Sequence, residues 1–131
     1  MPQTTRKNNN PEAMECYAFS DYLRWNHIFF FHIQNENKLL SKLGQAKYAI
    51  LGDMKKMGVL DGIPDYYIMV HTPKGLKILW LEMKSRTGKL TEAQKERLYE
   101  LEFKPIVYTA VAYCCDMAID IVEILIKTGE L

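Results

Sequence analysis

Two apolar runs joined by a short turn constrain the fold of this chain more than any other feature. The runs span residues 65–71 and 76–84, and residues 72–75 between them have the Thr-Pro-Lys-Gly composition of a tight turn. Both runs are rich in β-formers and apolar along most of their length, which is typical of strands in the middle of a sheet with both faces covered. The sequence therefore predicts a β-hairpin at the centre of a sheet.

Patterns on either side of this hairpin predict an α/β domain. A helix is favoured from Pro11, because proline suits a first turn and apolar residues recur on one face of the segment that follows. Further helices are predicted over residues 39–57, 91–102 and 117–127, and further strands over residues 28–33 and 106–112. We expect a flexible tail over residues 1–10 and a single domain over residues 11–131.

Composition excludes several classes of protein. Of the 131 residues, 48% are hydrophobic and 25% are charged, which is ordinary for a globular domain and unlike a disordered chain. No apolar run approaches the roughly 20 residues of a membrane-spanning helix, and residues 1–16 lack the apolar stretch of a secretory signal. The three cysteines form neither a disulfide framework nor a zinc-ligand spacing, so we expect a reduced, cytoplasmic setting without a membrane partner.

Charge is unevenly distributed along the chain, although the net charge is only +1. Residues 38–104 hold 13 of the 17 Lys and Arg but only 8 of the 16 Asp and Glu. A basic middle of this kind suits a surface that meets phosphate groups, although Lys-rich faces are often merely solvated. Nucleic acid is therefore a partner that the charge pattern allows.

The strongest indication of chemistry is a set of charged residues at the ends of the predicted hairpin strands. Pro64-Asp65 is followed, after sixteen residues, by Glu82-Met83-Lys84. Because alternate residues of a strand share a face, Glu82 and Lys84 point the same way and Met83 points opposite. Asp65 begins the neighbouring strand, so it lies beside Glu82 if the register of the hairpin allows.

Two carboxylates meeting at that point would repel each other unless a hard divalent cation lay between them. Mg²⁺ is typically held by one or two carboxylates together with water and substrate phosphate. Lys84 beside them could orient or deprotonate the attacking water, which is the equipment of metal-assisted phosphodiester hydrolysis. The alternative is that Asp65 caps a turn and that Glu82 and Lys84 form a surface ion pair.

Three motifs resemble those of the VRR-NUC family, the virus-type replication-repair nucleases of the PD-(D/E)XK superfamily. They are GVLDGIPD at residues 58–65, LEMK at residues 81–84 and GKLTEAQ at residues 88–94. The resemblance runs from about Glu12 to Val111, which is most of the chain. It implies a restriction-endonuclease-like core, in which a mixed β-sheet is flanked by helices.

The resemblance also implies the members of a catalytic site. Asp65, Glu82 and the backbone carbonyl of Met83 would hold Mg²⁺ or Mn²⁺, and Lys84 would be the catalytic lysine. All of these residues fall within the matching motifs. The prediction is therefore that they form one metal-dependent site.

A glutamate of the first helix usually completes sites of this kind, and this sequence offers two. Glu15 lies at about the distance from the next strand that is found in archaeal Holliday-junction resolvases. Glu12 fits the E-x-x-x-Q pattern common in the family better, but Cys16 stands where that pattern has Gln. Both glutamates are therefore candidate ligands.

Four further residues have both a functional and a structural interpretation. Gln94 is expected near the active site by resemblance, yet with Thr91 it also completes a capping box at a helix start. Asn35 falls where the family often has an Asn after the first strand, and Asn is also a common turn residue. Lys89 and Lys95 are candidate contacts to DNA phosphates, with solvated surface charge as the alternative.

Residues and resemblance together predict a Mg²⁺- or Mn²⁺-dependent deoxyribonuclease with no organic cofactor. The resemblance implies structure-specific endonuclease cleavage of branched or Holliday-junction DNA, in the cytoplasm of a bacterium or of a phage-infected host. One alternative is a non-catalytic DNA-binding module of the same fold. Another is an exonuclease that acts on DNA ends.

Small nucleases that are similar to this chain commonly act as homodimers, so a second copy of the chain is an expected partner. The predicted closing helix offers more apolar surface than one sheet face needs. Its stripe consists of Ile119, Val122 and Ile126, widened by Ile121, Ile124 and Leu125. We expect this stripe to form the dimer surface.

Overall fold

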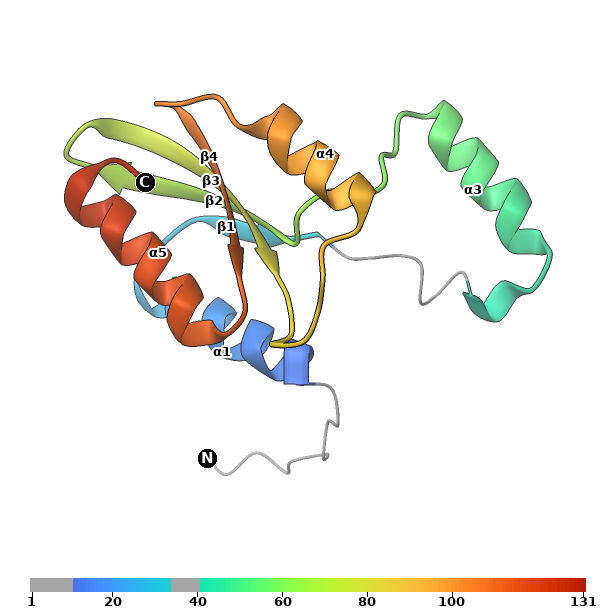
Figure 1. Ribbon diagram of the computed structural model, residues 1–131, viewed down its shortest axis with the longest axis horizontal. Helices are drawn as coiled ribbons and strands as arrows, with labels where there is room; N and C mark the ends of the chain where they lie inside the picture. Colours follow the sequence, from blue (N-terminus) through green and yellow to red (C-terminus); the bar gives the residue numbers. More distant parts are fainter. Residues whose placement is uncertain (1–10, 34–40) are drawn as a thin grey trace.

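A computed structural model of the protein describes residues 11–33 and 41–131. Within these ranges the chain forms a four-stranded mixed sheet with helices on both sides (Figure 1). The strands are β1 (Phe30–His32), β2 (Tyr66–Thr72), β3 (Gly75–Met83) and β4 (Val107–Ala112), in the spatial order β1-β2-β3-β4. The predicted α/β class and mixed sheet are confirmed, whereas the predicted tail at residues 1–10 and Asn35 lie outside the described residues.

The predicted hairpin forms the centre of the sheet. β2 and β3 pair antiparallel from Thr72 opposite Gly75 to Tyr66 opposite Leu81, and Gly75 has a φ of 93°, which a residue without a Cβ adopts readily. β1 pairs antiparallel with β2, and β4 pairs parallel with β3. β1 is shorter than the predicted strand over residues 28–33.

Only one face of the sheet is fully covered, contrary to the expectation that both faces of the central strands are buried. Along β2 the residues alternate between buried and half-buried, because the long helices α1 (Pro11–Trp25) and α5 (Cys115–Thr128) pack on the same side. The opposite side carries the shorter helix α4 (Glu92–Leu101), which contacts mainly β4 (Figure 1). Half of each central strand therefore faces an incompletely covered surface.

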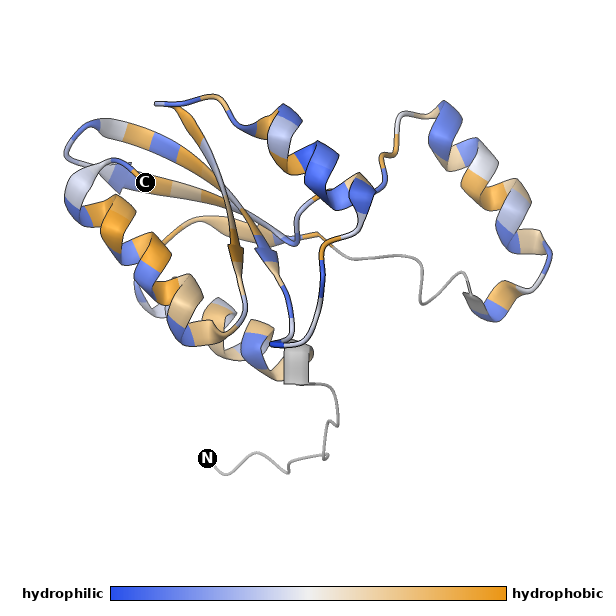
Figure 2. Ribbon diagram, in the orientation of Figure 1, coloured by the Kyte–Doolittle hydropathy of each residue, from blue (hydrophilic) through white to orange (hydrophobic). Residues whose placement is uncertain are grey.

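The core lies between α1, α5 and the covered face of the sheet. Phe19 and Leu23 of α1 are fully buried, as the predicted apolar face of this helix requires. Figure 2 shows the hydrophobic residues of α5 gathered along this helix. The strands contribute the remaining buried side chains, which are Tyr66, Ile68, Val70, Leu79, Leu81, Met83, Tyr108 and Ala112.

The apolar stripe of α5 is used inside the domain rather than on its surface. Val122 and Leu125 have no exposed area, and Ile119, Ile121 and Ile126 are partly buried against the core. Ile124 alone of the stripe is about half exposed, at 49%. The burial of this stripe does not support the expectation that it forms a dimer surface, because most of its apolar side chains already pack against the sheet of the same chain.

The predicted helix over residues 39–57 is interrupted. The short 3₁₀ helix η1 (Ser41–Leu43) precedes Gly44, whose φ of 59° ends that turn, and α3 (Ala46–Lys56) follows. Leu39 lies outside the described residues. α3 has no buried residue and extends away from the sheet, as Figure 1 shows. None of the helices in the described ranges is long and apolar enough to cross a membrane.

Candidate active site

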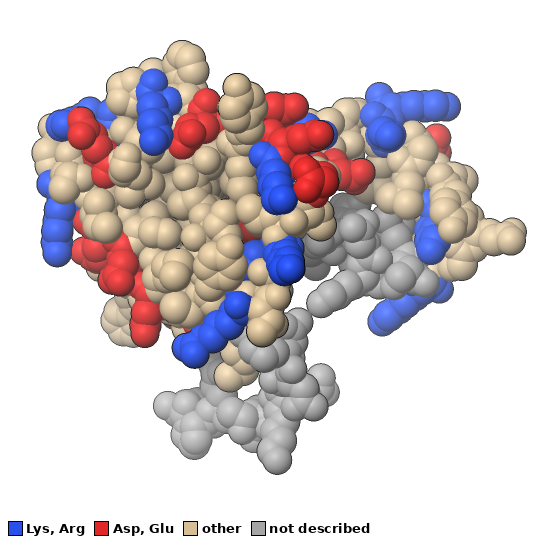
Figure 3. Space-filling model, viewed as in Figure 1, with Lys and Arg blue, Asp and Glu red and all other residues tan. Residues whose placement is uncertain are grey.

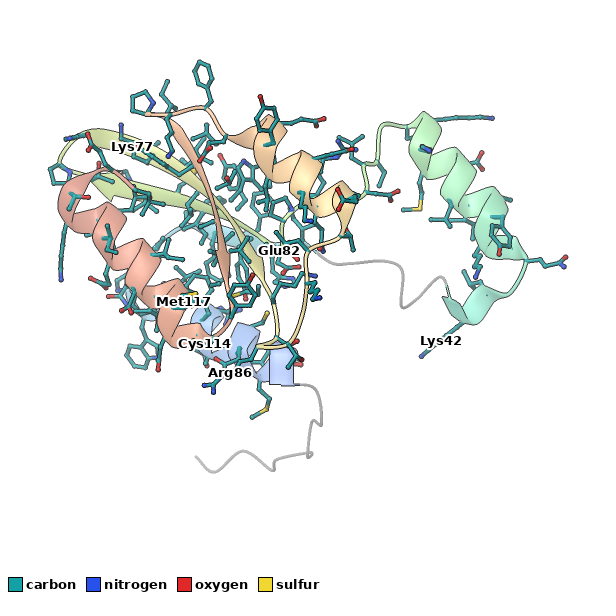
Figure 4. All side chains as sticks on the ribbon, in the orientation of Figure 1. Lys42, Lys77, Glu82, Arg86, Cys114 and Met117 are labelled. Atoms are coloured by element: carbon teal, nitrogen blue, oxygen red, sulfur yellow. The ribbon has the colours of Figure 1, made fainter. Side chains whose placement is uncertain are left out.

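Two carboxylates meet at one end of the central hairpin. Because Tyr66 pairs with Leu81, the next positions along the two strands bring Asp65 opposite Glu82. Asp65 Oδ2 accepts a hydrogen bond of 2.8 Å from the backbone N–H of Met83, which fixes this carboxylate against the end of β3. Figure 4 shows Glu82 near the end of β3, toward α4.

Burial and mutual repulsion weaken the acidity of this pair. Glu82 is only 3% exposed, and burial followed by the negative charge of Asp65 raises its pKa from 4.5 to about 8. Burial also raises the pKa of Asp65, although the hydrogen bond from Met83 opposes this shift. A pKa raised in this way favours the protonated form of Glu82 at neutral pH in the absence of a cation.

Lys84 supplies the positive charge nearest to the pair. Its Nζ lies 3.8 Å from Glu82 Oε1, and its side chain is only 15% exposed. Its backbone N–H donates a 2.8 Å hydrogen bond to the carbonyl of Ala112, so β4 holds the residue in line with β3. The side chain of Met83 between them is fully buried on the opposite face, as strand alternation predicts.

Gln94 combines the two interpretations that its sequence position allowed. Its Oε1 accepts from the N–H of Thr91 at 2.9 Å, and its own N–H donates to Thr91 Oγ1 at 3.1 Å, which completes the capping box of α4. Its Nε2 also donates to Glu82 Oε1 at 3.1 Å. One side chain therefore anchors both the start of α4 and one carboxyl of the pair.

A close approach of backbone to backbone holds α4 at this distance. Gly62 has a φ of 75°, and a Cβ at that position would lie 2.5 Å from the carbonyl carbon of Ala93. Any side chain there would push the start of α4, and with it Gln94, away from Glu82. This contact explains the glycine of the loop that leads into Asp65.

The carboxylates open into a cleft of about 840 Å³ between α3, the 58–63 loop and α4. Two cationic residues also line this cleft, Lys55 from α3 and Arg97 from α4. Arg97 Nε donates to the carbonyl of Asp61 at 2.9 Å, which ties α4 to the loop. Sequence reasoning did not single out Lys55, because the only signal was its place in a basic helix end.

Glu15, Glu12, Lys89 and Lys95 are the other predicted site residues within the described ranges. Glu15 Oε2 accepts a hydrogen bond from the backbone N–H of Cys115 at the start of α5. Glu12 is in the first turn of α1, and its side chain is not among those described. Lys89 is exposed, and Lys95 is exposed and pairs with Glu92 at 3.1 Å.

No cluster of three or more His, Cys, Asp or Glu side chains suited to a metal occurs in residues 11–33 and 41–131, as far as their side chains are described. Within that part of the chain, the candidate site therefore offers two carboxylates to a metal, those of Asp65 and Glu82. In this structure the carboxylate of Glu15, one of the two predicted ligands from α1, accepts the hydrogen bond from Cys115.

Comparison with known proteins gives a match at the level of structure. No protein-family model matches the sequence, and no curated protein matches it either. A solved structure described as a "VRR_NUC domain protein" superposes with a TM-score of 0.62 and 20% sequence identity, covering 92% of this chain and 93% of that chain. The fold is therefore a VRR-NUC-like variant of the restriction-endonuclease-like α/β core.

Proposed function

We propose that this protein is a metal-dependent deoxyribonuclease that hydrolyses phosphodiester bonds. The observation that carries the proposal is the convergence of Asp65, Glu82 and Lys84, of which the two carboxylates line the 840 Å³ cleft. The VRR-NUC-like fold supports the same reaction class, since the structurally similar protein is described as a "VRR_NUC domain protein".

The donor chemistry at this point fits Mg²⁺ or Mn²⁺. The buried carboxyl group of Glu82 and the half-buried one of Asp65 together carry more negative charge, once ionised, than the single ammonium of Lys84 can balance. In a strand the N–H and C=O of one residue point to the same side, so the Met83 carbonyl faces the side of Asp65. Two carboxylates and a carbonyl, completed by water and phosphate oxygens, are a ligand set that Mg²⁺ accepts.

When bound, the cation would supply positive charge to the phosphate and make water more acidic. Asp65 and Glu82, with the Met83 carbonyl, hold the cation in this proposal, and the ligand from α1 would be Glu12 or Glu15. Lys84 orients the attacking water and balances charge on the phosphate. Gln94 holds the Glu82 carboxyl in place through its 3.1 Å hydrogen bond.

Cationic residues around the cleft would bind the phosphates that flank the one being cut. Lys55 and Arg97 line the cleft, and Lys89 and Lys95 are exposed near its α4 side. Figure 3 shows further Lys side chains on the projecting α3 segment. Contacts of this kind position the nucleic acid without reading its sequence.

We propose branched DNA, such as a Holliday junction, as the substrate and a homodimer as the active form. We place the dimer surface on η1 and α3 rather than on α5. These two helices carry the exposed apolar residues Leu43, Tyr48, Ile50 and Leu51. Light scattering that gives a monomer mass at micromolar concentration would contradict the dimer. The cytoplasm of a bacterium or phage-infected host is the proposed setting.

The test compares cleavage of labelled four-way junction, flap and linear duplex DNA by wild type and Lys84→Ala, with Mg²⁺, with Mn²⁺ and with EDTA. Wild type is expected to cut a branched substrate only with metal. Loss of the group that assists proton transfer and charge balance is expected to slow cleavage by about 10²-fold or more, while DNA binding is retained. Lys74→Ala is the matched control, because Lys74 is an exposed lysine in the turn at the opposite end of the hairpin from Asp65 and Glu82, where it pairs with Glu130.

Two other outcomes would replace the proposal. If neither protein cuts any DNA in either metal but both bind it, the chain is a non-catalytic DNA-binding module of the same fold. If wild type removes nucleotides only from ends and ignores the junction, it is an exonuclease. Cleavage by wild type in EDTA would contradict the metal requirement.

A further inference from the structure

A row of four aromatic rings crosses the incompletely covered face of the sheet. Phe29 directly precedes β1, Phe31 lies in β1, Tyr67 in β2 and Trp80 in β3. Ring centroids are 6.5 Å apart between Phe29 and Phe31, 4.8 Å between Phe31 and Tyr67, and 5.0 Å between Tyr67 and Trp80. We call these four residues the aromatic row.

The aromatic row is accessible to a ligand. Phe29 is 61% exposed and Phe31 is 45% exposed, while Tyr67 and Trp80 are half-buried. Rings of this size are normally buried in a core, and here the core face of the same strands is already filled by α1 and α5. Within residues 11–33 and 41–131, the packing of the domain therefore leaves this aromatic surface without a complete cover.

The aromatic row is continuous with the candidate active site. Tyr67 of β2 follows Asp65 by two residues, and Trp80 precedes Glu82 by two residues on β3. Two residues of a strand span about 7 Å and return to the same face. A strand of DNA whose phosphate lies at the carboxylates would therefore bring its neighbouring bases to Tyr67 and Trp80.

Chemistry and charge at the two ends of this surface match the two parts of a nucleotide. The four positions of the row carry no charge, whereas Lys84, Arg97 and Lys55 surround the carboxylate end and the cleft. Aromatic rings stack on bases, and cations contact phosphates. In a duplex the base faces are already stacked on each other, so rings on a protein surface reach base faces only where the bases are unpaired.

We propose that the aromatic row stacks on unpaired bases of the strand that is cut, so that the substrate class is DNA with a single-stranded segment, such as a flap. The inference rests on the nuclease function proposed above and narrows its branched substrate to structures that carry unpaired bases, such as a flap rather than a fully paired four-way junction. A fully paired duplex would meet the carboxylates without using the row.

Binding in EDTA separates this inference from catalysis. We would measure the affinity of the full chain for fluorescein-labelled oligothymidylate and for blunt duplex of the same length. Phe31→Ala is expected to weaken binding of oligothymidylate about tenfold and to leave duplex binding unchanged. Tyr99→Ala is the matched control, because Tyr99 is an aromatic residue of α4 that is 87% exposed and outside the row.

A second readout does not depend on removing a ring. In Trp25→Phe protein, whose remaining tryptophan is Trp80, oligothymidylate is expected to quench the tryptophan fluorescence and duplex is not. Trp25 itself is 83% exposed and lies on α1, outside the row. Thermal unfolding of each variant shows whether it is folded under the conditions of the titration.

Several results would overturn the inference. Phe31→Ala that binds oligothymidylate like wild type, or that loses affinity for both DNAs equally, excludes base stacking at the row. Conversion of a dimer to a monomer by Phe31→Ala would assign the row to a second copy of the chain.

If wild type cuts DNA with metal but the row variants bind normally, only this inference fails. If wild type never cuts but Phe31→Ala still loses single-strand affinity, the hydrolytic proposal fails and the row stands as a single-strand binding surface.

Discussion

The two faces of the sheet differ in how they are covered and in what their side chains do. On β3, Leu79 and Leu81 have no exposed area and pack against the helices α1 and α5. Trp80 and Glu82, which alternate with them, face the side that carries α4 and the cleft. The same strands thus build an apolar core on one side and the candidate site on the other.

Because side chains alternate between the two faces, one strand can carry residues that stabilise the core and, between them, residues of the candidate site. Residues on the covered face contribute apolar burial, and their removal leaves cavities. Residues on the other face can include ionisable groups such as Glu82, whose burial costs free energy unless a proton or cation compensates it. Substitutions at neighbouring positions of one strand therefore test whether the separation holds.

The largest effect on stability is expected from a matched pair of substitutions on β3. Leu79→Ala leaves a cavity in the core and is expected to lower the free energy of unfolding by about 2–5 kcal/mol. Ile78 is the adjacent residue on the other face and is only half-buried, so Ile78→Ala is expected to cost less than about 1.5 kcal/mol. Urea unfolding of both variants measures the difference. Equal losses would show that the two faces contribute equally to stability.

A smaller effect, on the order of a few kcal/mol, is expected from the pH dependence of the metal-free protein. The pKa of Glu82 is raised from 4.5 to about 8 in the folded chain, so the folded state binds this proton more tightly than the unfolded state. The free energy of unfolding in EDTA is therefore expected to fall as pH rises from about 4.5 to about 8.

Glu82→Gln is the control for this pH dependence, because the amide keeps the shape of the side chain and has no titrating proton. The variant is expected to lose less stability than wild type between those two pH values in EDTA. If the free energy of unfolding changes with pH equally in both proteins, the pKa of Glu82 is not raised by burial and by the charge of Asp65.

Local pattern was sufficient to predict the hairpin and the acidic pair. The turn at residues 72–75 fixes which residues of β2 and β3 are opposite, and counting back from that turn brings Asp65 to Glu82. The capping box of Thr91 and Gln94 was readable for the same reason, since its partners are three residues apart. Each of these features depends on short separations in sequence.

Features that depend on contacts between distant segments were not predictable. The stripe of α5 was apolar as expected, but a pattern does not tell whether such a face covers its own sheet or a second chain. The hydrogen bond from Gln94 to Glu82 depends on the close approach of Gly62 to Ala93, which no local pattern encodes. Glu15 is on the predicted helix, yet its partner, the amide of Cys115, is 100 residues away.

The smallest effect, about 1 kcal/mol, is expected at the start of α4, where one side chain serves both stability and the site. Thr91→Ala removes the cap of the helix and is expected to lower the free energy of unfolding by about 1 kcal/mol with little change in cleavage. Gln94→Ala is expected to cost a similar amount of stability and, in addition, to slow cleavage by about 10- to 100-fold, since it also frees the Glu82 carboxyl. Denaturant unfolding of the two variants measures the capping of α4, and single-turnover cleavage measures the contribution of Gln94 to the candidate site. If both variants cut DNA equally fast, Gln94 acts only as a helix cap, and the side of the sheet that bears Glu82 does not depend on α4 for its chemistry.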